Sequence, residues 1–301
     1  MITVGIAAFN EERTIGEVLQ NLLSQEYPED FEILIVGGGS DKTSDIVRGY
    51  VERFTNIRFI EERERRGKPA AINEILKSAR GRVIVITDGD VFPAKDSITR
   101  LLQPFEQADV GATCGQIASL GSREGVFGFW ASFLCWAAHR KRLYDDRNDQ
   151  FFTLSGNLCA FRRGIVAGIP TDLLADDAAF GLLIKLKGYK VKYVPNAKVY
   201  IRYPQSFIDF LTQRRRTFAG YLQIEERYGV TERSLSTEAK GGFLGGLGGA
   251  LHFCENLKEC WFFFMLGLIR VLAWFLATID YKVKRKGLLE TWKPVKSSKP
   301  A

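Results

Sequence analysis

The sequence predicts a doubly wound α/β fold with a mostly parallel sheet, followed by a hydrophobic helical tail. From residue 2 to about residue 118, short apolar runs rich in β-branched residues alternate with segments of helical period. Residues of the capping type, such as Ser40 and Asp41, stand where helices should begin. The chain then changes in character, because residues 260–279 are apolar apart from Arg270. Alternating strands and helices are typical of a sheet covered by helices on both faces.

The first half of the chain supplies five predicted strands. In a parallel sheet of this kind, ligands bind beyond the carboxyl ends of the strands. The loops Phe9–Glu12, Gly37–Asp41 and Asp88–Asp90 should therefore converge on one candidate site. The predicted strands are Ile2–Ala8, Glu32–Val36, Ile57–Ile60, Arg82–Thr87 and Val110–Gln116.

The second half begins with a long predicted helix over residues 123–144, which is rich in aromatic residues and ends in basic ones. It is either packed in the core or laid on a membrane with its basic end toward lipid headgroups. An irregular stretch, Phe151–Arg163, follows. The remaining predicted elements are a helix over Ala175–Lys187, strands at Val191–Val194 and Lys198–Ile201, and a helix over Ser206–Arg227.

The tail is predicted to associate with a membrane. Insertion of Cys260–Ile279 is only marginally favourable because Arg270 offsets part of its apolar content. A single crossing from the cytosol would also place the basic residues 282–286 outside, against the positive-inside tendency. A helical hairpin with Gly241–Phe253, an interfacial helix, and a soluble helical pair packed on the domain or on a second subunit stay open. The spacing Gly241, Gly245, Gly249 would suit the hairpin.

Composition narrows the possible chemistry. The net charge of +7 suits anionic partners, but the basic residues are scattered and form no nucleic-acid-binding motif, so no nucleic acid is expected. With only two histidines, His139 and His252, a zinc site or a triad built on histidine is not indicated. The five cysteines form no CxxC pair and are interpreted as reduced thiols. Acid and base chemistry must then fall to carboxylates.

Three charged clusters could carry that chemistry. Asp88 and Asp90 leave a strand end together, and such a pair can hold a divalent cation and, through it, a diphosphate, although aspartates also mark turns. Asp176-Asp177 is either a catalytic pair or an acidic helix N-terminus. The run Arg214–Arg216 is either a phosphate-binding group, a solvated basic face or a contact with lipid headgroups.

Taken together and in order, seven segments resemble the family 2 glycosyltransferases, which include cellulose, chitin and hyaluronan synthases and many enzymes that add single sugars. The resemblance covers residues 2–228. It implies a GT-A fold, a nucleotide-diphosphate sugar donor from the cytosol, Mg²⁺ or Mn²⁺, and inversion at the anomeric carbon. The segments are Ala8–Ile15, Glu32–Val36, Gly67–Asn73, Asp88–Val91, Ser155–Arg163, Ala175–Phe180 and Gln213–Arg216.

The resemblance also implies roles for single residues. Phe9 and Glu11 would line the nucleoside pocket, Asp88 would face the donor, and Asp90 would coordinate the metal together with Asp88. Asp177 would be the general base, and its neighbour Asp176 could raise its pKa through like charge. The other residues that the matched segments mark for donor or substrate binding are Lys68, Gly156, Asn157, Asp176, Gln213, Arg214 and Arg216.

Three positions depart from the family pattern. Gly37-Gly38 stands in place of an aspartate pair that helps to read the base, Ala7 replaces a proline, and Thr217-Phe218 replaces the tryptophan of processive members. Because the chain also has few possible membrane crossings, transfer of single sugars is favoured over polymer synthesis.

The sequence therefore predicts a metal-dependent inverting glycosyltransferase, with residues 1–118 as a nucleotide-binding half, 119–230 as an acceptor half, and 231–301 as a membrane-associated tail. The catalytic domain would face the cytoplasm, and the acceptor would be a hydroxyl of a lipid-linked molecule or a glycan. Two alternatives stay open. One is a polyprenyl-phosphate sugar synthase, whose phosphate acceptor needs no base. The other is a catalytically silent protein that binds a nucleotide sugar or a partner enzyme at the membrane.

Overall fold

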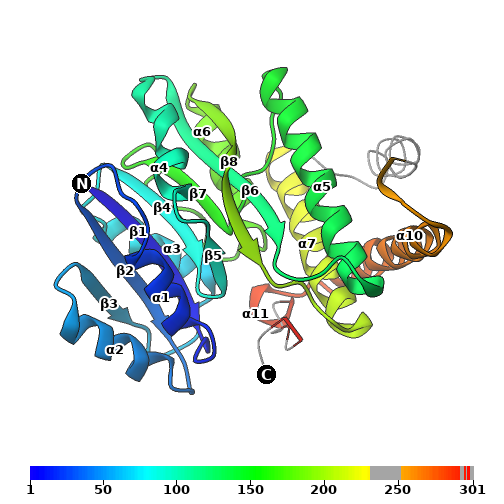
Figure 1. The fold of residues 1–301 in the computed structure, drawn as a ribbon, viewed down its shortest axis with the longest axis horizontal. Coiled ribbons are helices and arrows are strands. Elements are labelled where there is room, and N and C mark those ends of the chain that lie inside the picture. The colour runs from blue at the N-terminus through cyan, green and yellow to red at the C-terminus, as the bar shows by residue number, and fades with distance from the viewer. Residues whose placement is uncertain (231–251, 292–294, 296, 299–301) are drawn as a thin grey trace.

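The computed structural model describes residues 1–230, 252–291, 295, 297 and 298, and contains one eight-stranded sheet in the order β3-β2-β1-β4-β7-β6-β8-β5 (Figure 1). The first four strands in that order are parallel, β6 and β8 are also parallel, and β7 and β5 run antiparallel to their neighbours. The predicted mostly parallel α/β sheet is confirmed. The strands are β1 Ile2–Phe9, β2 Phe31–Gly38, β3 Ile57–Glu61, β4 Val83–Asp88, β5 Val91–Pro93, β6 Val110–Ser119, β7 Leu158–Arg162 and β8 Lys190–Ile201.

Helices cover both faces of the sheet because apolar side chains point alternately to its two sides. Along β2, Ile33 and Ile35 pack with α1, α2 and α4, whereas Leu34 and Val36 pack with α3 and α6 on the other face. The helices are α1 Ile15–Leu23, α2 Thr43–Arg53, α3 Lys68–Ser78, α4 Ser97–Leu102, a 3₁₀ turn Gln103–Glu106, α5 Gly125–Arg147, α6 Asp176–Leu186, α7 Phe207–Tyr228, α10 Leu257–Thr278, a π-helical turn Ile279–Val283, and α11 Leu288–Thr291.

Three parts of the sheet differ from the sequence-based expectation, and one of them is the three-residue strand β5, which was not predicted. The stretch predicted as irregular contains β7, a short antiparallel strand between β4 and β6. The two strands predicted on either side of Pro195 form one strand, β8. The register with β6 jumps between Gly115 and Gln116, so Pro195 lies in a bulge, where the missing N–H breaks no ladder hydrogen bond.

Helix α5 is packed in the core, as the first of its two interpretations stated. Phe129 and Trp130 are fully buried, and the Trp130 indole N–H donates to the carbonyl of Phe262 on α10 at 2.7 Å. At the start of α5, the Arg123 guanidinium binds the Glu259 carboxylate at 2.6 Å. These contacts fix α10 to α5 across more than a hundred residues of sequence.

Helix α10 has one packed face and one exposed face. Ala273, Trp274 and Ala277 pack on α7, where the Trp274 and Phe218 rings stack with centroids 4.3 Å apart. The segment Leu257–Val283 is long and apolar enough to cross a membrane, and an 18-residue window within it has a mean hydropathy of 2.1. The predicted hairpin partner, with Gly241, Gly245 and Gly249, lies outside the described residues.

After α10 the chain returns toward the sheet and places α11 beside it (Figure 1). We call the described residues of 280–298 the C-terminal strap. Asp280 forms ion pairs with Arg215 of α7 and with Lys286, the latter at 2.8 Å. Further along, the Ser297 amide donates to the Asp209 carboxylate at 2.8 Å. The strap is thus attached to α7 at both of its ends.

Candidate active site

A cavity of about 240 Å³ lies at the carboxyl edge of the sheet, where the chain switches from one side of β1 to the other. The predicted loops after β1 and β4 line it, and so does Gly37 at the end of β2. We call it the switch-point cavity. Its lining residues are Ala7, Ala8, Phe9, Asn10, Glu11, Val36, Gly37, Glu62, Arg65, Gly67, Lys68, Ala71, Asp88, Gly89, Asp90, Val91, Asn157, Ile201, Arg202, Gln213, Arg216, Leu288, Leu289, Val295 and Ser298.

Hydrogen bonds between the loops hold this edge together. The Glu11 amide donates to the Thr43 hydroxyl at 2.7 Å, and the Thr14 hydroxyl donates to the Gly89 carbonyl at 2.8 Å. The second bond ties the loop after β1 to the turn that carries Asp88 and Asp90. Both predicted acidic residues are therefore presented by a turn that is anchored to the loop after β1.

Close packing requires glycine at Gly37, the first residue of the pair that replaces the family's aspartates, and at the nearby Gly39. A Cβ atom on Gly37 would lie 1.7 Å from the Ala8 carbonyl oxygen, and one on Gly39 would lie 2.0 Å from Asn10 Oδ1. Both glycines have positive φ angles, +152° and +138°, which side chains disfavour. In this backbone no side chain can stand at Gly37.

Lys68 is the centre of a charged cluster. Its ammonium Nζ lies 2.5 Å from Asp88 Oδ1 and 3.9 Å from Asp176 Oδ2. Burial lowers the Lys68 pKa, but the carboxylates around it outweigh burial, and the net pKa is raised well above its ordinary value. Burial raises the pKa of Asp88 to about 6, with Lys68 opposing the rise and Asp90 adding to it.

Asp177 lies beside this cluster at the start of α6. Its Oδ2 accepts a hydrogen bond from the Gly156 amide at 3.2 Å, and its Oδ1 accepts one from the Ala178 amide at 2.9 Å. Burial, and next the charge of Asp176, raise the Asp177 pKa to about 6, while Lys68 and the two amides oppose the rise. A carboxylate with that pKa is deprotonated at neutral pH and still basic enough to take a proton.

The basic segment of α7 divides its side chains among different surroundings. Gln213 and Arg216 line the cavity, and Arg216 has its pKa lowered to about 10 by burial and by Arg214, with Asp88 and Asp90 opposing. Arg214 does not line the cavity, and its guanidinium lies 5.7 Å from the Phe210 ring centroid. Arg215 is paired with Asp280 of the strap.

The structure thus brings most of the predicted site residues together. Phe9, Glu11, Lys68, Asp88, Asp90, Asn157, Gln213 and Arg216 line the cavity. Lys68 connects the cavity to Gly156, Asp176 and Asp177, which do not line it themselves. The Lys68 ammonium lies 3.9 Å from Asp176 Oδ2. A Cβ atom on Gly156 would be 3.3 Å from Lys68 Nζ and 3.4 Å from Asp177 Oδ2. Of the predicted set, Arg214 is the one that points elsewhere.

Sequence reasoning missed two contributions to the cavity. Arg65 reaches it from the loop before α3, with its guanidinium 5.8 Å from the Phe9 ring centroid. The strap adds Leu288, Leu289 and Val295, and a Cβ atom on Gly67 would be 2.6 Å from a methyl group of Leu288. No pattern in the sequence links residue 288 to residue 67, because only tertiary packing brings them together.

The carboxylates of the cavity suit a hard divalent cation only when a bound ligand supplies further oxygen atoms. Within the described ranges, no group of three or more His, Cys, Asp or Glu side chains is arranged to hold a metal ion. Asp88 and Asp90 do offer carboxylate oxygens, and the position of the Lys68 ammonium shows that Asp88 attracts a cation. Mg²⁺ is commonly bound by one or two carboxylates together with substrate phosphates. The residues therefore fit a metal that binds with a diphosphate.

Comparison with known proteins agrees with this geometry. The sequence model of glycosyl transferase family 2 matches residues 3–169, more than half of the chain. The poly-β-1,6-N-acetyl-D-glucosamine synthase of Staphylococcus aureus strain COL is 27% identical over 228 residues, which are 73% of this chain and 54% of that protein. The synthase of the same name from Staphylococcus epidermidis is 26% identical over 224 residues, 71% of this chain and 53% of that protein. The chain spans about half the length of these relatives.

Solved structures share the fold at lower sequence identity. A mannosyltransferase from Pyrobaculum calidifontis, in complex with GDP-Man and Mn²⁺, has a TM-score of 0.67 and 22% identity, covering 95% of this chain and 88% of that one. Residues 1–349 of S. aureus TarS, in complex with UDP-GlcNAc, have a TM-score of 0.50 and 16% identity, covering 93% of this chain and 80% of that one. At these identities the likeness shows the fold alone.

Proposed function

Because the chain belongs to glycosyl transferase family 2, we propose that it moves a sugar from a nucleotide-diphosphate sugar to an acceptor hydroxyl, with inversion at the anomeric carbon. The observation that carries this proposal is the position of Asp177, held by two backbone amides beside the cluster of Lys68 and Asp88. Residues 1–118 would bind the donor, and residues 119–230 would bind the acceptor.

In the proposed reaction, Asp177 removes the proton from the acceptor hydroxyl as its oxygen attacks the anomeric carbon. The bond from that carbon to the diphosphate breaks, and the electron pair leaves with the nucleoside diphosphate. A single displacement of this kind inverts the configuration. Arg216, which lines the cavity, would stabilise the negative charge on the leaving group. Asp90 and Asp88 would hold Mg²⁺ or Mn²⁺, which would supply further charge stabilisation when bound.

The different effects expected from replacing Asp90 and from replacing Asp177 test this proposal. Asp90→Ala should abolish metal-dependent donor binding, whereas Asp177→Asn should leave donor binding intact and reduce transfer by about 10³-fold, since general-base catalysis contributes about 10²- to 10⁴-fold. Calorimetry with UDP-N-acetylglucosamine and GDP-mannose, with Mn²⁺ and with EDTA, measures the first quantity, and a transfer assay measures the second.

Asp30→Ala is the matched control for this experiment. Asp30 is exposed and precedes β2, at the edge of the sheet away from the cavity, and its replacement should change neither quantity. Unchanged donor affinity of the Asp90 variant in Mn²⁺ would refute the metal assignment. Full transfer activity of the Asp177→Asn variant would refute the base and favour a phosphate acceptor.

A polyprenyl-phosphate sugar synthase is the second candidate, because the exposed face of α10 gives the chain an apolar surface suited to lipid. Trp261, Phe264 and Leu268 recur at helical spacing on that face and are 59%, 46% and 57% exposed. In either case we propose a membrane-associated protein whose catalytic domain faces the cytoplasm, where nucleotide sugars are made. With α10 packed along α7, an interfacial position suits the chain better than a free transmembrane span.

A further inference from the structure

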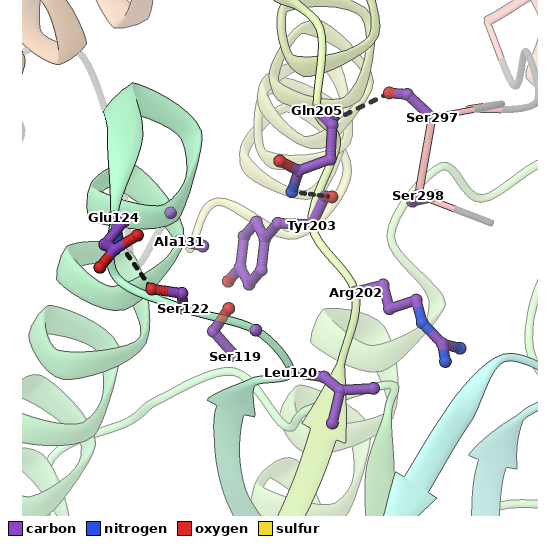
Figure 2. A pocket seen from close by; sticks show the side chains of 12 residues that line it. Ser119, Leu120, Ser122, Glu124, Ala131, Arg202, Tyr203, Gln205, Ser297 and Ser298 are labelled. Carbon is purple, nitrogen blue, oxygen red and sulfur yellow. Dashed lines mark hydrogen bonds between the residues drawn. The ribbon is translucent and has the colours of Figure 1, made fainter. Parts of the chain in front are cut away.

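A second cavity, of about 500 Å³, lies between the ends of β6 and β8, the start of α5 and the strap (Figure 2). None of the residues implied by the family resemblance lines it. Its volume is within the roughly 300 to 1,000 Å³ usual for small-ligand sites. The lining residues are Ser119, Leu120, Gly121, Ser122, Glu124, Gly128, Ala131, Arg202, Tyr203, Gln205, Ser297 and Ser298.

The second cavity adjoins the switch-point cavity, because Arg202 and Ser298 line both. Arg202 follows β8 directly, and its guanidinium lies 5.1 Å from the Phe92 ring centroid. Figure 2 shows this guanidinium turned away from Tyr203 and toward the neighbouring strands. Its Nη1 is buried and has no hydrogen-bond partner among the described residues. A buried donor of this kind favours a ligand oxygen at the junction of the two cavities.

The lining of the second cavity is dominated by neutral hydrogen-bonding groups. Ser119, Ser122 and Ser298 contribute hydroxyls, and Gln205 contributes an amide. The Tyr203 ring lies between Ser119 and Gln205, and Leu120 adds an apolar side chain (Figure 2). Many hydroxyl and amide groups with a small apolar surface match the mixed polar and C–H faces of a sugar ring. A lipid tail would need a mostly apolar channel, and a polyanion would need more than one cation.

We propose that the second cavity binds the non-reacting part of a glycan acceptor, and that Arg202 contacts an acceptor oxygen where the two cavities meet. This proposal rests on the proposed function, since it places the acceptor next to the donor. The ends of β6 and β8, the start of α5 and the strap build the cavity, so the strap would contact both substrates.

Filling the cavity tests the proposal. Ser119→Phe places a ring in the lining at the end of β6, and Leu120→Trp does the same from a residue that is 40% exposed. Saturation-transfer NMR would use a β-1,6-linked N-acetylglucosamine trisaccharide and a mannose trisaccharide as probes, with dodecyl phosphate as the lipid-phosphate probe. We expect at least one trisaccharide to bind the unmodified chain, and both variants to weaken that binding by more than tenfold.

Ser24→Phe is the matched control, because Ser24 is exposed at the end of α1 and lines neither cavity. Calorimetry with the sugar donor on the same samples distinguishes failure of the proposed function from failure of the cavity proposal. An unmodified chain that binds no sugar donor would overturn the proposed function. The cavity proposal is tested only by the binding of the acceptor probes.

Three outcomes would overturn the cavity proposal. Trisaccharide binding could persist unchanged in both folded variants, which would place the glycan elsewhere. A chain that binds donor could bind neither trisaccharide. Dodecyl phosphate could be the one probe that binds the unmodified chain, with weaker binding in both variants. That result would assign the cavity to a lipid phosphate.

Discussion

Two kinds of structure form the walls of the switch-point cavity, and they depend on the sequence in different ways. One wall is built from the loops after β1 and β4 and from the start of α3, where hydrogen bonds from the backbone of Glu11 and Gly89 to threonine hydroxyls fix the loops. The other wall is built from α7 and the strap, whose position depends on contacts such as the ion pair between Arg215 of α7 and Asp280 of the strap. The first wall follows from strand ends that are adjacent in the sheet. The second depends on packing between distant segments.

The largest effect should come from the first wall, at Lys68. Removing the cation in Lys68→Met leaves Asp88 half-buried and unpaired, and removing one partner of a buried pair costs about 3–5 kcal/mol. We expect transfer to fall by roughly 10²- to 10³-fold, measured as kcat/KM.

The control for Lys68→Met is Lys77→Met, an exposed lysine on the same helix, which should keep full activity. Equal activities in the two variants would show that the cluster does not organise the site.

The pH dependence of transfer also tests the charged cluster beside the first wall. The Asp177 pKa is raised, mainly by burial, to about 6, so the carboxylate is protonated below that pH and loses its function as base. The rate of transfer should fall by about tenfold per pH unit on the acid side of 6 and level off above it. A pH profile of kcat/KM at saturating Mn²⁺ measures this limb. A rate that is flat from pH 7 to pH 5 would contradict the assignment of Asp177 as the base.

The second wall should be less sensitive. Leu288 lines the cavity and contacts Gly67, so Leu288→Ala removes apolar contact with a bound donor. Leu288 is partly buried, and loss of part of a leucine side chain that a bound donor would cover is worth about 1–2 kcal/mol, or roughly tenfold in donor affinity. Calorimetry with the donor checks this, and Leu257→Ala, at a leucine that is 89% exposed, is the control. Unchanged affinity would remove the strap from the donor site.

The smallest effect on transfer to a soluble acceptor should come from the exposed face of α10. Replacing Trp261, Phe264 and Leu268 with serine leaves the packed face of the helix intact. Binding to anionic lipid vesicles should fall at least tenfold in a sedimentation assay, while soluble transfer stays the same. Leu186→Ser, at a leucine of α6 that is 68% exposed, is the control. Vesicle binding that survives the triple replacement would move the membrane contact elsewhere.

The same contrast explains what the sequence could predict. The strands β1 to β4 and β6 were predicted close to their observed bounds because apolar runs and turn residues are local signals. The approach of Phe9, Asp88 and Asp90 follows from adjacent strand ends. The strands β5 and β7 were missed because they have only three and five residues and run antiparallel to their neighbours.

The strap and the second cavity could not be predicted, for a physical reason. Leu288 and Gly67 are brought together by the packing of α10 on α7. Likewise, the backbone amide of Gln205 donates to the Ser297 hydroxyl at 3.0 Å. Contacts between residues so far apart leave no periodic signal. The direction of Arg214 was missed for a similar reason, because three consecutive arginines on a helix must point to different sides.

In the donor site proposed above, the tight fit at Gly37 would limit how a preference for a nucleobase can change. A substitution there would force a side chain into the Ala8 carbonyl, so the simplest exchange with the rest of the family is closed to this backbone. Under the proposed function, variation in donor choice would arise at other residues that line the cavity, such as Arg65 and those of the strap. For an engineer, those positions, rather than the glycine turn, are the places to build a library.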